Sequence, residues 1–192
     1  PELRVLQPRV VPLGGIRAMP VQRTLPHRDL SLIGAWCFLD QFASDGQAAM
    51  EVLPHPHTAL QTVTWPFTGT IRHRDSLDND LFVKPGELNL MTAGRGICHS
   101  EVTTPGTDVL HGVQLWTVLP KESADLTREF QHHAPTLDDN HSGVQSRVFI
   151  GTLGDASSPI QTETPLLGAE LILAPGTTWE TDVDPTFEHG VL

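Results

Sequence analysis

The amino-acid sequence predicts an all-β protein whose strands form a sandwich or a barrel. Between residues 55 and 120, short segments rich in β-branched and aromatic residues alternate with turns rich in Gly, Pro, Asn and Asp. Closely spaced strands of this kind are typical of β-sandwiches and β-barrels. Hydrophobic residues make up 39% of the 192 residues and charged residues 18%, which is the balance of a globular chain and not of a disordered one. The length suits one large domain or two small ones.

The first fifty residues are expected to form short strands joined by turns. Residues 32–39 are apolar on both faces and too short for a helix, so a buried strand is preferred there, followed by a polar loop that ends at Met50. Alternating patterns predict earlier strands at 3–6 and 21–25, and glycines predict a turn around 13–15.

The central part of the chain contains the best strand candidates. Pro66 lies at the end of one of them, and because proline lacks a backbone donor, this strand is expected to lie at a sheet edge or to be locally irregular. The candidates are 60–65, 69–75, 81–83, 88–91 and 109–119, of which the last is the longest.

The pattern breaks between residues 120 and 145, where a short helix is predicted at 123–130. We therefore expect a first domain over 1–135 and a second over 136–192. The second would be a partial barrel, because so few residues leave strand edges that must be covered or paired. Its expected strands are 146–150, 169–173, 177–181 and the beginning of another at 187–192.

The charge and cysteine content narrow the classes of function. Twelve Lys and Arg against 23 Asp and Glu give a net charge of −11, which repels phosphate backbones and argues against direct nucleic-acid binding. Two cysteines, Cys37 and Cys98, outside any C-x-x-C pair do not indicate a disulfide framework, and Cys98 is interpreted as a small buried residue. No apolar run resembles a signal peptide or a membrane span, so a cytoplasmic protein without membrane contact is expected.

Two short motifs each place two metal-binding side chains on one face of an extended strand. The first is the pair His55 and His57, which alternate with prolines, and the second is the pair His99 and Glu101. Three imidazoles and one carboxylate suit a divalent first-row metal such as iron, copper, nickel or zinc. Either motif alone is weak evidence, because His and Glu are common on surfaces, but together they predict one shared metal site.

Other polar residues invite functional interpretations that are less favoured. His73 and Asp75 form a third alternating pair, but their position beside two arginines favours a turn-stabilising role over metal ligation. His111 is expected to be a hydrogen-bonded imidazole in the core or beside the metal ligands. Arg95 is expected to position the loop that carries His99 or to contact an anionic ligand. The remaining assignments are solvated side chains for His132, His133 and His141 and turn-forming roles for Gly94 and Gly96.

Several segments together resemble the pirin family of the cupin superfamily, and the segment 61–65 resembles its bacterial branch. The similarity begins near residue 23 and extends over most of the chain, although pirins continue beyond residue 192 and many of them differ at 66–69. The segments that carry the resemblance are Pro54-His55-Pro56-His57, His73-Arg74-Asp75-Ser76-Leu77, Met91-Thr92-Ala93-Gly94-Arg95-Gly96, His99-Ser100-Glu101 and Leu110-His111-Gly112-Val113-Gln114-Leu115-Trp116.

The resemblance implies a bicupin of two double-stranded β-helix (jelly-roll) barrels, of which the second is incomplete in this chain. It implies one metal in the first barrel, usually iron(II), held by His55, His57, His99 and Glu101. The donors themselves leave copper, nickel, zinc or manganese as alternatives. It also implies quercetin 2,3-dioxygenase activity on a small aromatic, flavonol-like substrate with O2. Glu101 would take the substrate's proton or serve only as a metal ligand, and both roles stay open.

Two other hypotheses stay open beside the dioxygenase. In the first, the protein is a metal-dependent binding module for a protein partner, such as a metabolic enzyme or a transcription factor. In the second, it is a truncated pirin whose second half only packs against the first.

Overall fold

The computed structural model describes residues 3–13, 19–44, 49–139 and 143–192. Within these residues, strands and one 3-10 turn, η1 (Lys121–Ser123), are the only regular elements, so the all-β prediction is confirmed. None of the helical segments in this described part has the length and hydropathy that a membrane crossing requires.

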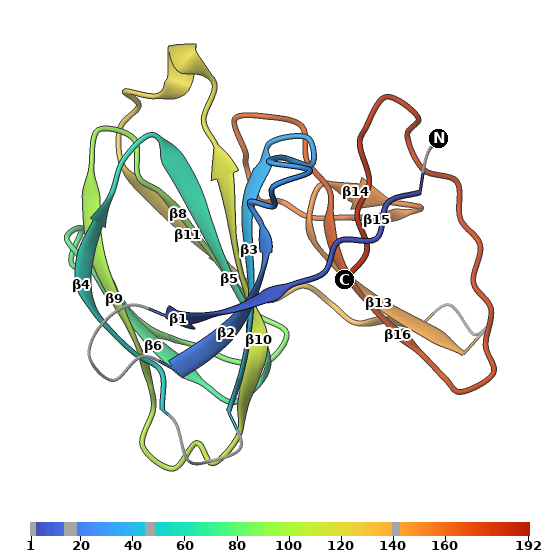
Figure 1. The fold of residues 1–192 in the computed structure, drawn as a ribbon, viewed down its shortest axis with the longest axis horizontal. Helices are drawn as coiled ribbons and strands as arrows, with labels where there is room; N and C mark the ends of the chain where they lie inside the picture. The colour runs from blue at the N-terminus through green and yellow to red at the C-terminus, as the bar shows by residue number, and fades with distance from the viewer. Residues whose placement is uncertain (1–2, 14–18, 45–48, 140–142) are drawn as a thin grey trace.

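Two sheets face each other and form a barrel, with the C-terminal strands packed beside it (Figure 1). The larger sheet has the order β1 (Arg9–Leu13), β2 (Met19–Leu25), β3 (Trp36–Ser44), β10 (Leu110–Val118), β5 (Leu60–Thr68), β8 (Leu88–Thr92) and β11 (Glu129–His133). The smaller sheet has the order β4 (Glu51–His57), β9 (Ile97–Thr103), β6 (Ile71–Asp75) and β7 (Asp80–Val83). The C-terminal strands form a three-stranded sheet of β12 (Asp138–Asp139), β13 (Val144–Ile150) and β16 (Gly168–Leu173), and a pair of β14 (Thr152–Leu153) and β15 (Ala156–Ser157).

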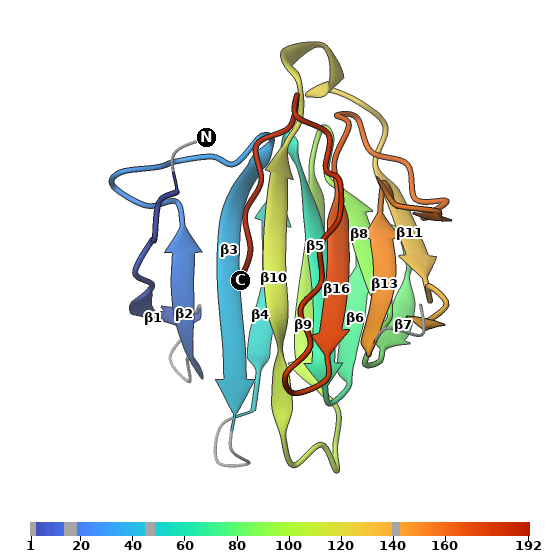
Figure 2. The ribbon, with the colours of Figure 1, turned by 90° about the vertical axis from the view of Figure 1, so that its right-hand side faces the viewer.

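The larger sheet is covered on both faces, which explains why β5 is buried throughout most of its length. Thr64 points into the barrel, because its hydroxyl reaches Glu101 on the opposite sheet. Its neighbour Trp65 points the other way and stacks on Phe149 of β13, with ring centroids 4.4 Å apart. Figure 2 shows β13 and β16 lying across this outer face. By alternation, Thr62 and Thr64 of β5 face the barrel interior, and Val63 and Trp65 belong to the core shared with the C-terminal strands.

Pro66 lies in a central strand and is accommodated by a local irregularity. β5 pairs with both β10 and β8, so the edge alternative is wrong and the irregular-strand alternative is confirmed. The register shifts between His111 and Gly112, which is the residue opposite Pro66. The backbones approach closely there, since a Cβ on Gly112 would lie 2.6 Å from the carbonyl oxygen of Trp65.

Several strand boundaries differ from those expected. Residues 3–6 form no strand, and the first strand is β1 instead. The buried strand predicted at 32–39 begins only at Trp36 and continues to Ser44, into the start of the expected loop, whose residues 45–48 lie outside the described residues. Its buried residues alternate, so only one of its faces is buried. No strand forms at 177–181 or 187–192. The turn predicted around 13–15 lies largely outside the described residues.

The helix predicted at 123–130 is wrong, because only η1 forms and Glu129–His133 becomes a strand. A short isolated helix is marginal in water, whereas β11 gains a full ladder of hydrogen bonds along β8. β11 is the last strand of the barrel and β12 the first of the three-stranded sheet. A domain boundary between 135 and 136 fits this change of sheet and remains a proposal.

Candidate metal centre

His55 and His57 meet His99 because β4 and β9 are antiparallel neighbours with an irregular register. Val52 lies opposite Glu101, but the register then shifts by one residue, so that His55, and not Pro54, lies opposite His99. Such a bulge exchanges the faces of the residues that follow it. Without it, His55 would point away from His99. Pro54 lacks a backbone donor and is suited to this irregular position.

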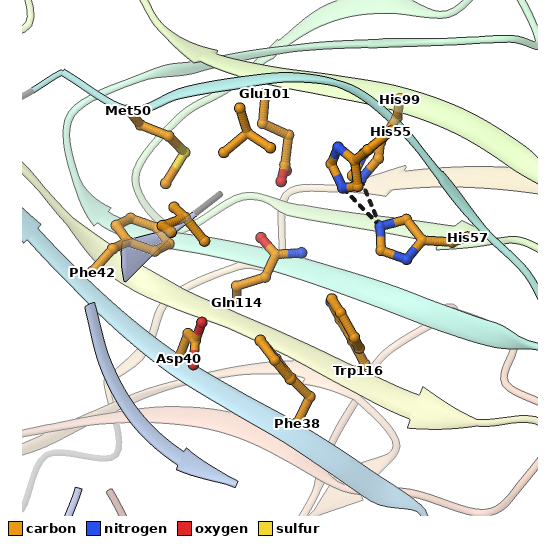
Figure 3. A pocket seen from close by; sticks show the side chains of 12 residues that line it. Phe38, Asp40, Phe42, Met50, His55, His57, His99, Glu101, Gln114 and Trp116 are labelled. Carbon is orange, nitrogen blue, oxygen red and sulfur yellow. Dashed lines mark hydrogen bonds between the residues drawn. The ribbon is translucent and has the colours of Figure 1, made fainter. Parts of the chain in front are cut away.

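Three imidazole nitrogens converge on one point at the inner surface of β4 and β9 (Figure 3). The Nε2 atoms of His55 and His57 are 2.9 Å apart. The Nε2 atom of His99 lies 3.1 Å from each of the other two.

The triangle formed by these three Nε2 atoms fits a metal ion. A neutral imidazole nitrogen is either a proton donor or an acceptor, so three mutually close nitrogens cannot all be satisfied by shared protons. At least one pair must bring two like groups together, either two lone pairs or two N–H groups, and a cation bound by all three lone pairs removes this conflict. A first-row ion about 2.1 Å from each nitrogen fits against a triangle of this size, because the corners lie closer than that to its centre. The described residues therefore suit the metal that the motifs predict.

Burial lowers the pKa of two of these histidines and so favours metal binding over protonation. Burial, followed by the neighbouring imidazoles, lowers the pKa of His57 to about 4. The same causes lower the pKa of His99 to about 3. Both rings are therefore neutral at pH 7 and carry a free lone pair, so protons do not compete with a metal for them.

Glu101 lies next to the histidines but does not join their triangle. Its Oε1 accepts a hydrogen bond of 2.5 Å from the Thr64 hydroxyl, and the side chain is 5% exposed. It forms a second group with His73 and His99, whose potential ligand atoms all lie within 4.8 Å of one another. Its role as the fourth ligand remains a proposal.

A pocket opens beside the histidines and is lined by both sheets (Figure 3). One wall is aromatic, because Phe38 and Trp116 stack with ring centroids 3.9 Å apart and planes 10° apart. Trp116 also touches the ring of His57 edge-on, at 5.0 Å between centroids. The lining residues are Leu13, Phe38, Asp40, Phe42, Met50, Val52, His55, His57, His99, Glu101, Gln114 and Trp116.

Two polar residues of the pocket wall, Asp40 and Gln114, were not predicted from the sequence. Asp40 is fully buried and is held by Arg23 through two hydrogen bonds of 2.7 and 2.6 Å. Gln114 lies between Asp40 and Thr64 in the strand register. Alternation along β10 puts Gln114 and Trp116 on one face, but no local signal shows that this face is the one that meets the histidines.

The other candidate residues do not join the triangle. His73 and Asp75 form a 3.2 Å contact, and Asp75 also accepts hydrogen bonds from the turn at 77–79, which confirms the turn-stabilising role. His111 contacts Gln41 at 3.0 Å, which confirms a hydrogen-bonded imidazole. His132 is not simply solvated, because its Nδ1 lies 2.7 Å from Asn89 Oδ1.

The remaining small motifs have structural roles or none that is visible. Gly94 and Gly96 have φ values of +48° and +137°, as expected for turn formers. Arg95 is exposed, and its positioning role stays a prediction. Cys98 is only half-buried, so its assignment as a buried residue is wrong. His133 is half-buried, and His141 lies outside the described residues.

A small β-barrel in which histidines of two paired strands converge on one point defines a protein of the cupin class. A family model described as Pirin matches residues 18–117. A Pseudomonas aeruginosa protein provisionally named a quercetin 2,3-dioxygenase is 41% identical and covers 96% of this chain and 59% of its own length. A pirin-like protein of Caulobacter vibrioides is 34% identical and covers 82% of this chain and 59% of its own. The chain belongs to the pirin family.

The fold comparison agrees with the family. A crystal structure of quercetin 2,3-dioxygenase from Acinetobacter baumannii superimposes with a TM-score of 0.84 and 34% sequence identity. The match covers 93% of this chain and 60% of that one. The chain thus spans about three fifths of the length of the relatives it matches.

Proposed function

We propose that this protein is a metal-dependent dioxygenase that cleaves a flavonol-like aromatic substrate with O2. The observation that carries the proposal is the convergence of three histidine nitrogens beside a pocket with an aromatic wall. Two relatives that bear the name quercetin 2,3-dioxygenase support the same reaction class.

In this proposal, His55, His57 and His99 hold the metal, with Glu101 as the fourth ligand. Three nitrogens and one carboxylate oxygen suit iron(II), and copper, nickel, zinc or manganese are alternatives. Bound there, the ion would act as a Lewis acid that makes a coordinated substrate hydroxyl more acidic.

The protein's own groups supply binding and orientation. The stacked rings of Phe38 and Trp116 offer a flat apolar wall for an aromatic substrate. The amide of Gln114 lies in the same wall and can hydrogen-bond a substrate oxygen. Apolar residues on the opposite side, Phe42 and Met50, limit the access of water.

Glu101 is the proposed acceptor for the substrate proton. The hydrogen bond from Thr64 to Oε1 fixes the carboxylate on the side of the pocket next to the histidines. A base must lie within hydrogen-bond reach of its proton, and this placement offers that reach to a hydroxyl bound near the histidines.

The test combines metal analysis with oxygen consumption on protein purified without a His tag. Iron-loaded wild type should contain one metal ion per chain and consume O2 with quercetin. His57→Ala should lose the metal, whereas His111→Ala, a histidine outside the triangle, should keep it. Metal without O2 uptake would reject the dioxygenase and favour the metal-dependent binding module. A wild type without metal would overturn the site itself.

A further inference from the structure

Two buried ring nitrogens beside the metal centre have no hydrogen-bond partner, Nδ1 of His73 and Nδ1 of His99. The side chains are 1% and 2% exposed, respectively. Buried polar atoms are nearly always paired in folded proteins, so two such atoms on neighbouring side chains point to a shared function. The two rings lie 5.2 Å apart between centroids, with planes tilted by 51°.

The proton on His73 can be assigned from its other nitrogen. Nε2 of His73 lies 3.2 Å from Asp75 Oδ2. Asp75 is an acceptor in this network, because it receives the backbone N–H of Leu77 at 2.8 Å and the side-chain amide of Asn79 at 2.9 Å. His73 therefore carries its proton on Nε2, and its Nδ1 is left as a lone pair, an acceptor without a donor.

The proton on His99 follows from its place in the triangle. Nε2 of His99 is one of the three converging nitrogens, and a metal ligand must present a lone pair. The proton of a neutral His99 then sits on Nδ1, which makes that atom a donor without an acceptor. The unpaired donor of His99 and the unpaired acceptor of His73 are complementary.

The strand register brings the two groups together on one face of the smaller sheet. His73 lies opposite Glu101, and Asp75 lies opposite His99, in the pairing of β6 with β9. One ring nitrogen of His73, one ring nitrogen of His99 and one carboxylate oxygen of Glu101 lie within 4.8 Å of one another. A water molecule with hydrogen bonds of about 2.8 Å spans such a separation.

We propose that His73, fixed by Asp75, is a positioning residue for His99. It accepts the Nδ1 proton of His99 through one bridging water and thereby keeps the Nε2 lone pair of His99 aimed at the metal. The inference rests on the proposed metal function. Partners of this kind fix the tautomer and orientation of ligating histidines, and their loss weakens metal binding.

Two substitutions at one position separate this role from simple packing. His73→Phe keeps a ring against Phe130, which packs on His73 at 4.8 Å between centroids with the planes tilted by 35°, but removes the acceptor. His73→Asn loses volume but places an amide oxygen near the position of Nδ1. If His73 only fills space, the Asn variant is the more damaged one. If His73 positions His99, the Phe variant is the more damaged one.

Nickel titration by calorimetry is the first measurement, since Ni²⁺ avoids oxidation. We expect His73→Phe to weaken Ni²⁺ binding by about 10- to 100-fold. His73→Asn should stay close to wild type, and so should the control His111→Phe. Equal losses in both His73 variants, or none, would overturn the inference. Binding of a second Ni²⁺ to wild type, lost in both His73 variants, would also overturn the inference. The group of His73, His99 and Glu101 would then itself be a cation site.

Nitrogen-15 NMR of the histidine rings in metal-free protein gives an independent readout. Wild type should show the Nδ1–H tautomer at His99 and the Nε2–H tautomer at His73. His73→Phe should mix the His99 tautomers, and His73→Asn should restore the Nδ1–H form. An Nε2–H form of His99 in wild type would overturn the inference. If wild type binds no Ni²⁺, the proposed function fails, and the tautomers still decide this inference.

Discussion

Removal of the Thr64 hydroxyl tests how the two sheets together fix Glu101. Thr64→Val keeps the shape of the side chain but deletes the donor 2.5 Å from Glu101 Oε1. The same oxygen of Thr64 lies 3.1 Å from Gln114 Oε1, and a hydroxyl has one proton to give. The shorter contact and the charge of the carboxylate assign that proton to Glu101.

The expected cost follows from burial and charge. Hydrogen bonds to charged groups contribute about 1.5–3 kcal/mol, whereas neutral ones contribute about 0.5–1.5 kcal/mol. Because Glu101 is 5% exposed, water replaces the lost donor poorly. We therefore expect Thr64→Val to lower the free energy of unfolding of the metal-free protein by about 2 kcal/mol. Thr104→Val, which deletes half-buried hydrogen bonds to Thr107 and to the carbonyl of Thr70, should cost about 1 kcal/mol.

Urea denaturation followed by tryptophan fluorescence measures both variants. A double-mutant cycle of Thr64→Val with Glu101→Gln should show a coupling energy of about 1 kcal/mol or more. A coupling near zero, with Thr64→Val no worse than Thr104→Val, would refute the reasoning and assign the proton to Gln114.

Two further predictions concern the turn before β9 and the histidines. Gly94→Ala should be strongly destabilising, because φ is +48° and the new Cβ would lie 2.1 Å from the carbonyl oxygen of Leu126. Gly106→Ala also has a positive φ but meets no atom within 4 Å, so it should cost only about 1 kcal/mol, and equal melting temperatures would contradict the steric argument. Separately, the metal-free protein should lose stability as the pH falls from about 6.5 to about 4. The first value is the ordinary pKa of His57, which the unfolded chain keeps, and the second is its pKa in the folded chain. The unfolded chain binds more protons in that window, and His99 extends it to about pH 3. Thermal melts should show a shallower pH slope in His57→Phe than in wild type, and identical slopes would count against the lowered pKa.

The sequence by itself determined the strand content and the residues that we propose as metal donors. Alternation is a local property, so the spacing of His55 and His57 puts both rings on one face wherever the strand lies. The same reasoning placed His99 and Glu101 on one face of β9. It failed for residues 123–130, where a local pattern suggested a helix but pairing along β8 formed β11.

Only the tertiary structure decided that His55 and His57 of β4 meet His99 of β9. The register shift between Val52 and His55 turns His55 toward His99, and no periodicity in the sequence specifies that one-residue bulge. Likewise, the contact of Thr64 with Glu101 joins opposite sheets of the barrel. The physical reason is that register and sheet packing arise from long-range pairing, in which many contacts distant in sequence are satisfied at once.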